Sequence, residues 1–332
     1  MMHTVPYGKP IELRVTEGLR CVMDIILHLG VHRTATTTLH NAFKAHGSDL
    51  KARKIAFWGP DVLQSGVLDG VFPHDGLKTT KKRGADRAGG RLALRRAALE
   101  RAGADTLIVS DAALAGSMAQ NLREKRLYPG IGERAARLCH ALGGSVSRIV
   151  LGVRSQDAYW RSLVARCVGQ GHDIPAPSTC DEISGDTRSW QDVVLDVACA
   201  APNVKLSVAP FETHYGNPLI FMNSALGVPM SWGDSRFDWA MRAPSRRELR
   251  NALQDRGQNP DVIPAGEAAW TPFTDQHIEH MKERYLDDMH WLQSGADGLA
   301  QLTQEDSPKQ NAFAGEERGP IDEFKFKVEG SG

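Results

Sequence analysis

The chain has 332 residues, 41% of them hydrophobic, which is enough to bury a full core as one large α/β domain or as two smaller ones. Its 40 Lys and Arg residues balance 40 Asp and Glu residues, so net charge gives no reason to expect nucleic acid or an anionic membrane as a partner. No apolar run approaches the ~18 residues that a membrane-spanning helix needs, and residues 1–14 lack the apolar core of a signal peptide, so we expect a cytoplasmic protein without a transmembrane segment.

Short apolar runs alternate with helical patterns along the chain, an order that predicts an α/β fold of three layers, with a central parallel sheet covered by helices on both faces. The predicted strands are residues 21–29, 54–58, 106–111, 147–153 and 204–210. The predicted helices are residues 36–46, 88–103, 129–143, 156–169, 189–200, 216–227, 246–255 and 274–293.

Two helical patterns and one charged segment are informative. Over residues 156–169 an apolar stripe predicts one buried face, which leaves Tyr159, Ser162 and Arg166 on the opposite side. The last helix, with Thr274 as its N-cap, is predicted to dock through one apolar face. The basic segment 78–101 fits a loop that leads into a solvated helix, or a lid over an anionic ligand.

The five cysteines are odd in number and far apart, with no CxxC pair, so we expect them to be reduced and mostly to be small core residues. They are Cys21, Cys139, Cys167, Cys180 and Cys199.

One Arg and four Thr follow the first predicted strand, in the stretch HLGVHRTATTTL. A strand, a tight loop and a helix bring backbone N–H groups and a helix N-terminus together on an anion, usually a phosphate. Arg33 adds a fixed positive charge, and the hydroxyls of Thr36, Thr37 and Thr38 add donors at the first turn. Helix capping explains one Thr, but not four beside an Arg, so we interpret the loop as an anion site.

The Walker A loop of nucleotide-binding proteins fits this stretch poorly. That motif needs G-x-x-x-x-G-K-[ST], whereas counting from Gly30 places Ala35 and Thr36 where the second Gly and the Lys belong. The run TLIVSD, ending at Asp111, is typical of a Walker B strand, so a kinase or NTPase with a degenerate Walker A loop remains an alternative.

The same stretch resembles the 5′-phosphosulfate loop of the sulfotransferases that use 3′-phosphoadenosine 5′-phosphosulfate (PAPS), especially those of the bacterial branch. Arg33 takes the place of the family's usual Lys. The resemblance implies that Arg33, Thr34, Ala35, Thr36, Thr37 and Thr38 bind this sulfuryl donor, with no metal, in a P-loop-like sulfotransferase architecture.

A second motif, RIVLGVRSQDAYWRSLV, is similar to the family's 3′-phosphate site, with an Arg that closes a strand and a Ser in the following helix at the same separation. The resemblance implies that Arg154 and Ser162 bind the 3′-phosphate, for which a guanidinium fork and a hydroxyl are suitable groups. Two later segments, 206–229 and 273–292, resemble the family more loosely, the last through its Arg-Tyr-x-x-Asp centre.

The likeness runs from about Asp24 to Leu292, so we expect one sulfotransferase-like domain over residues 21–295. Residues 1–20 form an N-terminal extension. Residues 296–332 are rich in Gly and charge without sustained periodicity, so we expect a disordered tail.

The implied reaction transfers a sulfuryl group from PAPS to a hydroxyl of a small molecule or glycan, and Arg33 stabilises the leaving phosphate. An alcohol acceptor needs a general base. Asp111 is the first candidate, although it also suits an N-cap; His32 and His74 are rivals. His28 and His140 are interpreted as core residues instead.

Residues 57–66, 78–91 and 231–244 combine aromatic and charged side chains that suit a carbohydrate, although core packing explains each of Trp58, Trp232 and Trp239. A non-catalytic protein that keeps the nucleotide site is a further alternative.

Overall fold

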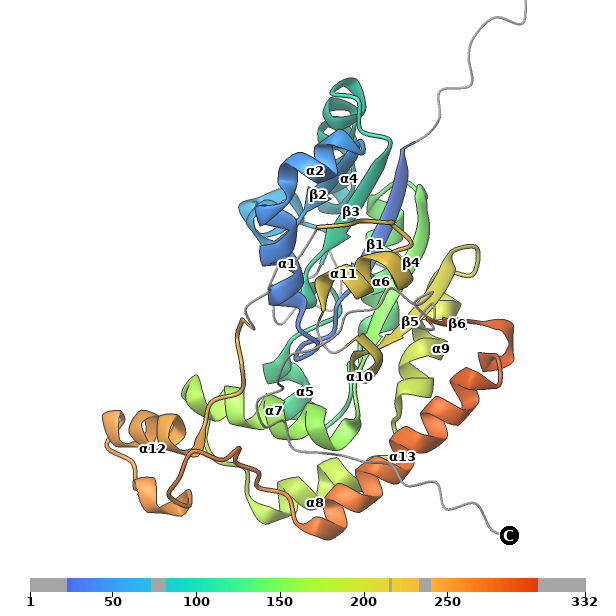
Figure 1. Cartoon of the computed structure of the whole chain (residues 1–332). Helices are drawn as coiled ribbons and strands as arrows, with labels where there is room; N and C mark the ends of the chain where they lie inside the picture. The colour runs from blue at the N-terminus through green and yellow to red at the C-terminus, as the bar shows by residue number, and fades with distance from the viewer. Residues whose placement is uncertain (1–22, 73–81, 215–216, 233–239, 304–332) are drawn as a thin grey trace, which may run out of the picture.

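The computed structural model describes residues 23–72, 82–214, 217–232 and 240–303. Within them six strands form one parallel sheet in the order β2-β3-β1-β4-β5-β6 (Figure 1). The strands are β1 (Asp24–Leu29), β2 (Ile55–Trp58), β3 (Thr106–Ser110), β4 (Val146–Val153), β5 (Lys205–Pro210) and β6 (Gln301–Leu302).

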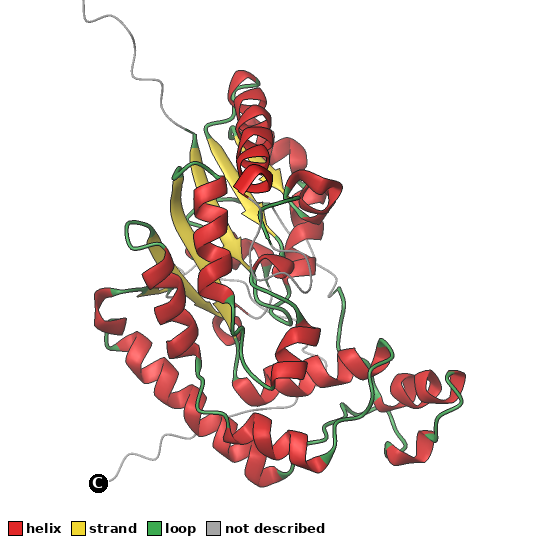
Figure 2. Cartoon of the chain, turned by 180° about the vertical axis from the view of Figure 1, so that it is seen from behind, coloured by secondary structure: helices red, strands yellow, loops and turns green. Residues whose placement is uncertain are grey.

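Helices cover both faces of the sheet, as predicted (Figure 2). Because side chains alternate along a strand, Ile25 and Leu27 of β1 belong to one buried cluster and Ile26 to the other. The smaller cluster joins the sheet to α1 (Thr36–Ala45), α2 (Gly47–Ala52) and α11 (Pro218–Ser224). The larger cluster includes α4 (Lys82–Arg101), α6 (Ile131–Ala141), α7 (Gln156–Gly169), α8 (Pro177–Gly185), α9 (Trp190–Ala200), α12 (Arg246–Asp255) and α13 (Asp275–Gln293).

The remaining helices are short: α3 (Pro60–Val62), α5 (Met118–Glu124) and α10 (Phe211–His214). The five predicted strands and the eight predicted helices are present, with ends shifted by up to six residues. The sequence patterns missed α2, α3, α5, α8 and α10, because a helix of nine residues or fewer shows little periodicity.

The ordered fold extends beyond the predicted end of the domain at residue 295. Ala296–Gly298 forms a 3₁₀ turn, and β6 pairs with β5, so the first eight residues of the expected tail belong to the sheet domain. Residues 304–332 and 1–22 lie outside the described residues. No described helix is both long and apolar enough to cross a membrane.

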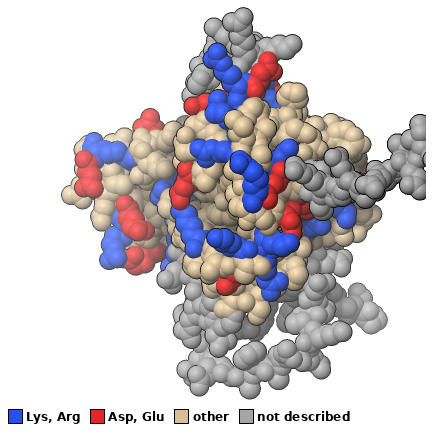
Figure 3. Space-filling model, turned by 90° about the horizontal axis from the view of Figure 1, so that it is seen from above, with Lys and Arg blue, Asp and Glu red and all other residues tan. Residues whose placement is uncertain are grey.

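Residues 82–101 of the basic segment form α4 in the outer layer of the fold, and residues 78–81 lie outside the described residues. The helix buries Ala88 and Leu92 against the sheet domain and packs on α6. Lys and Arg are mixed with Asp and Glu on the molecular face seen from above in Figure 3. Trp58 and Trp232 are buried, as core packing predicts, whereas Trp239 lies outside the described residues.

The strand order places the loop after β1 where a ligand site is expected. β1 lies between β3 and β4, and the chain leaves β1 toward β2 on one side and later returns to β4 on the other. In open parallel sheets, ligands bind at the carboxyl ends of the strands where the order reverses in this way. Residues 30–35 and Arg154 both lie at this edge.

Candidate anion-binding site

The loop between β1 and α1 holds its backbone in a strained conformation. Arg33 and Ala35 have φ angles of 70° and 58°, in the left-handed region that non-glycine residues seldom adopt. Ala35 is the N-cap of α1, and no side chain caps this helix. The first turn of α1 therefore presents N–H groups without side-chain partners, which is the arrangement that binds anions.

The four threonines of the loop divide into two pairs. Thr34 donates to the carbonyl of Val31 (2.7 Å), and Thr38 accepts from the N–H of Ala240 (3.1 Å). These two hold the loop and the segment beside it. Thr36 and Thr37 line a cavity instead, Thr36 buried and Thr37 exposed.

Gly30 allows this packing. A Cβ atom at residue 30 would lie 2.6 Å from Oγ1 of Thr36 and 2.8 Å from the ring of His28, closer than real side chains come. The glycine at the end of β1 is therefore required by close approach to α1, and not by a positive φ.

The two sequence motifs contact each other directly. The Nε of Arg33 donates to the hydroxyl of Ser162 (2.8 Å), and a terminal nitrogen of Arg154 donates to the carbonyl of Arg33 (2.7 Å). The guanidinium of Arg154 lies over the ring of Phe211, 4.5 Å from its centroid. Arg33, expected at the phosphosulfate, thus extends its side chain to Ser162, the residue expected at the 3′-phosphate.

One cavity of about 660 Å³ lies between these elements, a volume typical of small-molecule sites. The expected site residues that line it are His32, Arg33, Ala35, Thr36, Thr37, Arg154 and Ser162. Thr34, Thr38 and Asp111 do not line it. Its other described lining residues include Arg166 and Arg242, and no carboxylate.

Burial, and to a smaller extent neighbouring arginines, lower the pKa values of Arg33 and Arg154 at the cavity. Burial lowers the pKa of Arg33 to about 10, with Arg154 and Arg166 acting in the same direction. Burial also lowers the pKa of Arg154, against the opposite influence of Glu212. The described residues offer Arg33 and Arg154 no ion pair within 4 Å, and the Nε of Arg154 is buried without a partner among them. An anion in the cavity would relieve this repulsion.

Sequence reasoning missed Arg166, Gln170 and Arg242 as lining residues. Arg166 follows Ser162 by four residues on α7, so the helical spacing that selected Ser162 also indicates Arg166. Arg242 lies in the segment 231–244 that was considered for the acceptor. Tyr159, expected beside Ser162 on the polar face, is fully buried, because α7 is covered on most sides.

Asp111 occupies the N-cap position that was its alternative interpretation. Its Oδ1 accepts from the N–H of Ala113 and its Oδ2 from the side chain of Gln64, both at 2.9 Å. The side chain is buried, and its neighbour Ala112 lines the cavity. A carboxylate has about four acceptor positions, so Asp111 keeps capacity for a further bond.

The other histidines considered in the sequence analysis are His28, His140 and His74. His28 is a buried, hydrogen-bonded core residue, as interpreted. His140 is exposed on the outer side of α6, so its interpretation as a core residue was wrong; the helix turns it away from the sheet. His74 lies outside the described residues.

His28 and His40 share one hydroxyl beneath the loop. Nδ1 of His28 lies 2.7 Å and Nε2 of His40 lies 2.8 Å from Oγ of Ser110, so β1, β3 and α1 are joined by a buried bridge. Burial lowers the pKa of His28 to about 3, with His40 adding to the effect, and lowers the pKa of His40 to about 4.

This bridge predicts a loss of stability in acid. Between about pH 6.5 and pH 4 the unfolded chain binds protons that the folded imidazoles do not, so stability is full above this window and falls as the pH falls, by up to about 1.4 kcal/mol per pH unit for each imidazole. Denaturant unfolding at pH 7 and pH 5 measures the slope. His40→Gln should reduce it and the exposed His140→Gln should not; equal slopes for all three proteins would contradict the prediction.

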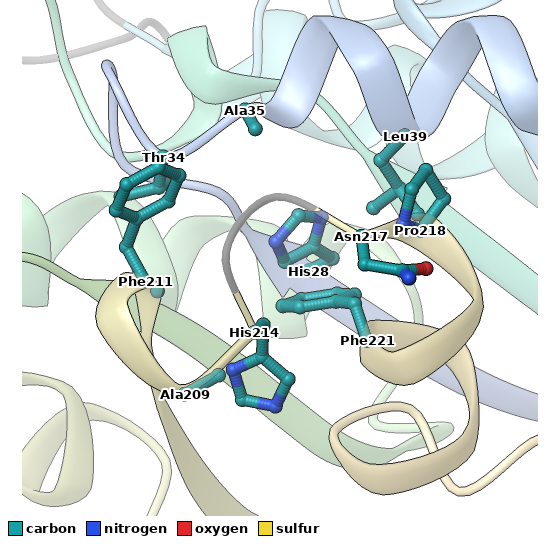
Figure 4. A pocket seen from close by; sticks show the side chains of 11 residues that line it. His28, Thr34, Ala35, Leu39, Ala209, Phe211, His214, Asn217, Pro218 and Phe221 are labelled. Carbon is teal, nitrogen blue, oxygen red and sulfur yellow. The ribbon is translucent and has the colours of Figure 1, made fainter. Parts of the chain in front are cut away.

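A second, smaller cavity lies beneath the loop (Figure 4). Its volume is about 20 Å³, room for about one water molecule. The rings of His28 and Phe221 pack beside it with centroids 4.9 Å apart. It is a packing gap under the larger site and not a second ligand site.

The Arg-Tyr-x-x-Asp centre of α13 supports the site indirectly, through hydrogen bonds to residues that neighbour it. Asp288 accepts from the backbone N–H groups of Trp190 (3.0 Å) and Gln191 (2.9 Å), and thereby fixes the start of α9. The indole of Trp190 in turn donates to the carbonyl of Arg154 (2.6 Å). The last helix thus orients the end of β4 through α9.

Tyr285 makes a parallel connection. Its hydroxyl donates to Glu212 (2.8 Å), whose other oxygen accepts from the N–H of Ser155 (2.9 Å). Arg284 donates to the carbonyl of Ser184 on α8 (2.9 Å).

No family model, curated protein or solved structure matches the chain. The geometry alone therefore defines the class of protein, which is a parallel α/β domain with an arginine-lined cavity at the carboxyl edge of its sheet.

Proposed function

We propose that the chain is a PAPS-dependent sulfotransferase, which transfers a sulfuryl group to a hydroxyl of a small molecule or glycan. The observation that carries the proposal is the convergence of two separate motifs on one cavity. The uncapped N-terminus of α1 with Arg33 lines one part of it, and Arg154 with Ser162 lines the other. PAPS carries anionic groups at both ends of its ribose, and two anion-binding elements around one cavity suit such a ligand.

The proposed reaction forms a bond from the acceptor oxygen to sulfur while the bond from sulfur to the phosphate oxygen breaks. The electron pair of that bond stays on the leaving phosphate, and the acceptor proton passes to a base. In this proposal Arg33 and the N–H groups of α1 stabilise the leaving group. Asp111 is buried beside the lining residue Ala112 and does not itself line the cavity, so it takes the proton through one bridging water molecule.

The 3′-phosphate is the sharpest part of the proposal, since it separates PAPS from ATP-like nucleotides. Calorimetric titration of the protein with 3′,5′-adenosine bisphosphate (PAP) and with AMP tests it. PAP should bind more tightly, and Arg154→Gln should weaken PAP about 30-fold, which is about 2 kcal/mol, while changing AMP less than about threefold.

The exposed Arg123→Gln on α5 is the matched control, because it removes the same charge at a residue that does not line the cavity. Equal affinity for PAP and AMP would contradict the assignment of Arg154 and Ser162 to the 3′-phosphate. Tighter, Mg²⁺-dependent binding of ATP would favour the kinase or NTPase alternative, for which Ala35 and Thr36 in place of Gly and Lys are unfavourable.

A further inference from the structure

Tyr128, which no sequence motif indicated, makes two hydrogen bonds to a residue of the anion loop. Its hydroxyl oxygen lies 2.7 Å from the backbone nitrogen of His32 and 2.9 Å from Nδ1 of the His32 ring. The tyrosine is 1% exposed and lies between α5 and α6, with a φ of 39°. A buried residue in a strained conformation thus holds one histidine at both its backbone and its ring.

The hydrogen atoms in this network can be counted. A backbone N–H can only donate, so the oxygen of Tyr128 accepts from the N–H of His32. Among the hydrogen bonds of the described residues, Nδ1 of His32 is then the acceptor that lies within reach of the single hydrogen of this buried hydroxyl.

The opposite assignment, with the ring hydrogen on Nδ1, is less favourable. The oxygen of Tyr128 would then accept from both nitrogen atoms of His32, and the buried hydrogen of Tyr128 would have no acceptor among the hydrogen bonds of the described residues. Buried polar groups without a partner are rare in folded proteins.

The surroundings keep the His32 ring neutral. Burial lowers the pKa of His32 to about 4; Arg33 and Arg134 lower it further, and only Asp111 acts against them. A neutral ring whose Nδ1 accepts a hydrogen bond carries its hydrogen on Nε2. The described residues make no hydrogen bond to Nε2, and the ring lines the cavity.

We infer that His32 presents a fixed Nε2–H donor to an anionic oxygen of the ligand, and that Tyr128 is the positioning residue that sets this tautomer. His32 is then a donor to the ligand and not the general base. The inference rests on the proposed function only for the identity of the ligand oxygen: if the ligand is PAPS, this oxygen belongs to its phosphate or sulfuryl group.

Nuclear magnetic resonance of the ¹⁵N-labelled full chain tests the tautomer without any nucleotide. At pH 7, long-range ¹H–¹⁵N correlation should show His32, assigned with His32→Gln, with Nε2 protonated and Nδ1 unprotonated. Titration with inorganic sulfate and with PAP should shift the Nε2 resonance. A ring protonated on Nδ1, or an Nε2 resonance that neither anion moves, overturns the inference.

Tyr128→Phe tests the positioning role. The variant should convert the single tautomer into a mixture, whereas Tyr285→Phe, which removes another buried hydroxyl bonded to Glu212, should leave it unchanged. With labelled PAPS, Tyr128→Phe should lower kcat about tenfold and change the Kd of PAP less than about threefold.

An unaltered His32 tautomer in folded Tyr128→Phe overturns the role of Tyr128. The measurement on the unmodified chain stands by itself if the variant does not fold. If PAP does not bind but sulfate shifts a protonated Nε2, the proposed function fails and the donor inference holds.

Discussion

Replacing Arg33 with Ala is expected to lower sulfuryl transfer about 1000-fold, the largest effect of any single change at this site. The substitution removes a charge that faces the cavity and also the bonds from its side chain to Ser162 and to the carbonyl of Met241. Transfer of labelled sulfate from PAPS to a panel of hydroxylated acceptors, carbohydrates included, measures the effect.

Arg33→Lys is the matched variant, since it keeps the charge and supplies the side chain usual in the resembling family. It should retain more transfer than Arg33→Ala, although an ammonium cannot reproduce the planar fork that reaches two partners. Transfer at an unchanged rate by Arg33→Ala would mean that a different set of residues performs the reaction. No transfer by the unmodified chain to any acceptor would favour a nucleotide-binding protein without turnover.

Asp288→Ala should destabilise the fold by about 4 kcal/mol, because it leaves buried donors of three groups without their acceptor. These are the backbone N–H groups of Trp190 and Gln191 and the side chain of Gln156. Urea unfolding at pH 7 measures the loss. The change should also weaken PAP binding, since Trp190 bonds to the carbonyl of Arg154.

The neighbouring Asp287 provides the control, because it is exposed on the same helix. Asp287→Ala should change the free energy of unfolding by less than about 0.5 kcal/mol. Asp288→Asn should lie between, because an amide keeps one acceptor oxygen but turns an NH₂ group toward an N–H donor. Equal stability of the two alanine variants would show that the carboxylate does not hold α9.

The sheet was predictable because its strands are buried on both faces and so appear as continuous apolar runs. β6 was not, since two residues carry no pattern, and its pairing with β5 depends on the position of α13. The absence of a sequence pattern in so short a strand also explains why residues 296–303 were expected to belong to a tail.

The family resemblance implied that Arg33 and Arg154 serve one ligand, and the two residues lie together because parallel strands end at one edge of a sheet. The direction of their side chains did not follow from it. The left-handed backbone at Arg33 belongs to a loop in which Arg33 bonds to Ser162, 129 residues away, and no local pattern specifies such a contact.

The same reason hid Tyr128 from sequence analysis. It lies 96 residues from His32, outside any periodic segment, and its role depends on a buried hydrogen bond that no local pattern specifies. Asp111 illustrates the reverse case: its position was correctly placed at the end of β3, but two neighbours already share its carboxylate.

The left-handed residues of the loop bear on how a ligand would be bound. A non-glycine residue in this conformation costs about 1–2 kcal/mol, so Arg33 and Ala35 are held there by the surrounding contacts when the chain folds. The free-energy cost of this conformation is therefore borne when the chain folds and not when a ligand binds. The N–H donors are already ordered before an anion arrives. Preorganisation of this kind strengthens binding without adding a contact. Glycine at residue 35 would ease the strain of folding and, by the same argument, loosen the site before any ligand arrives.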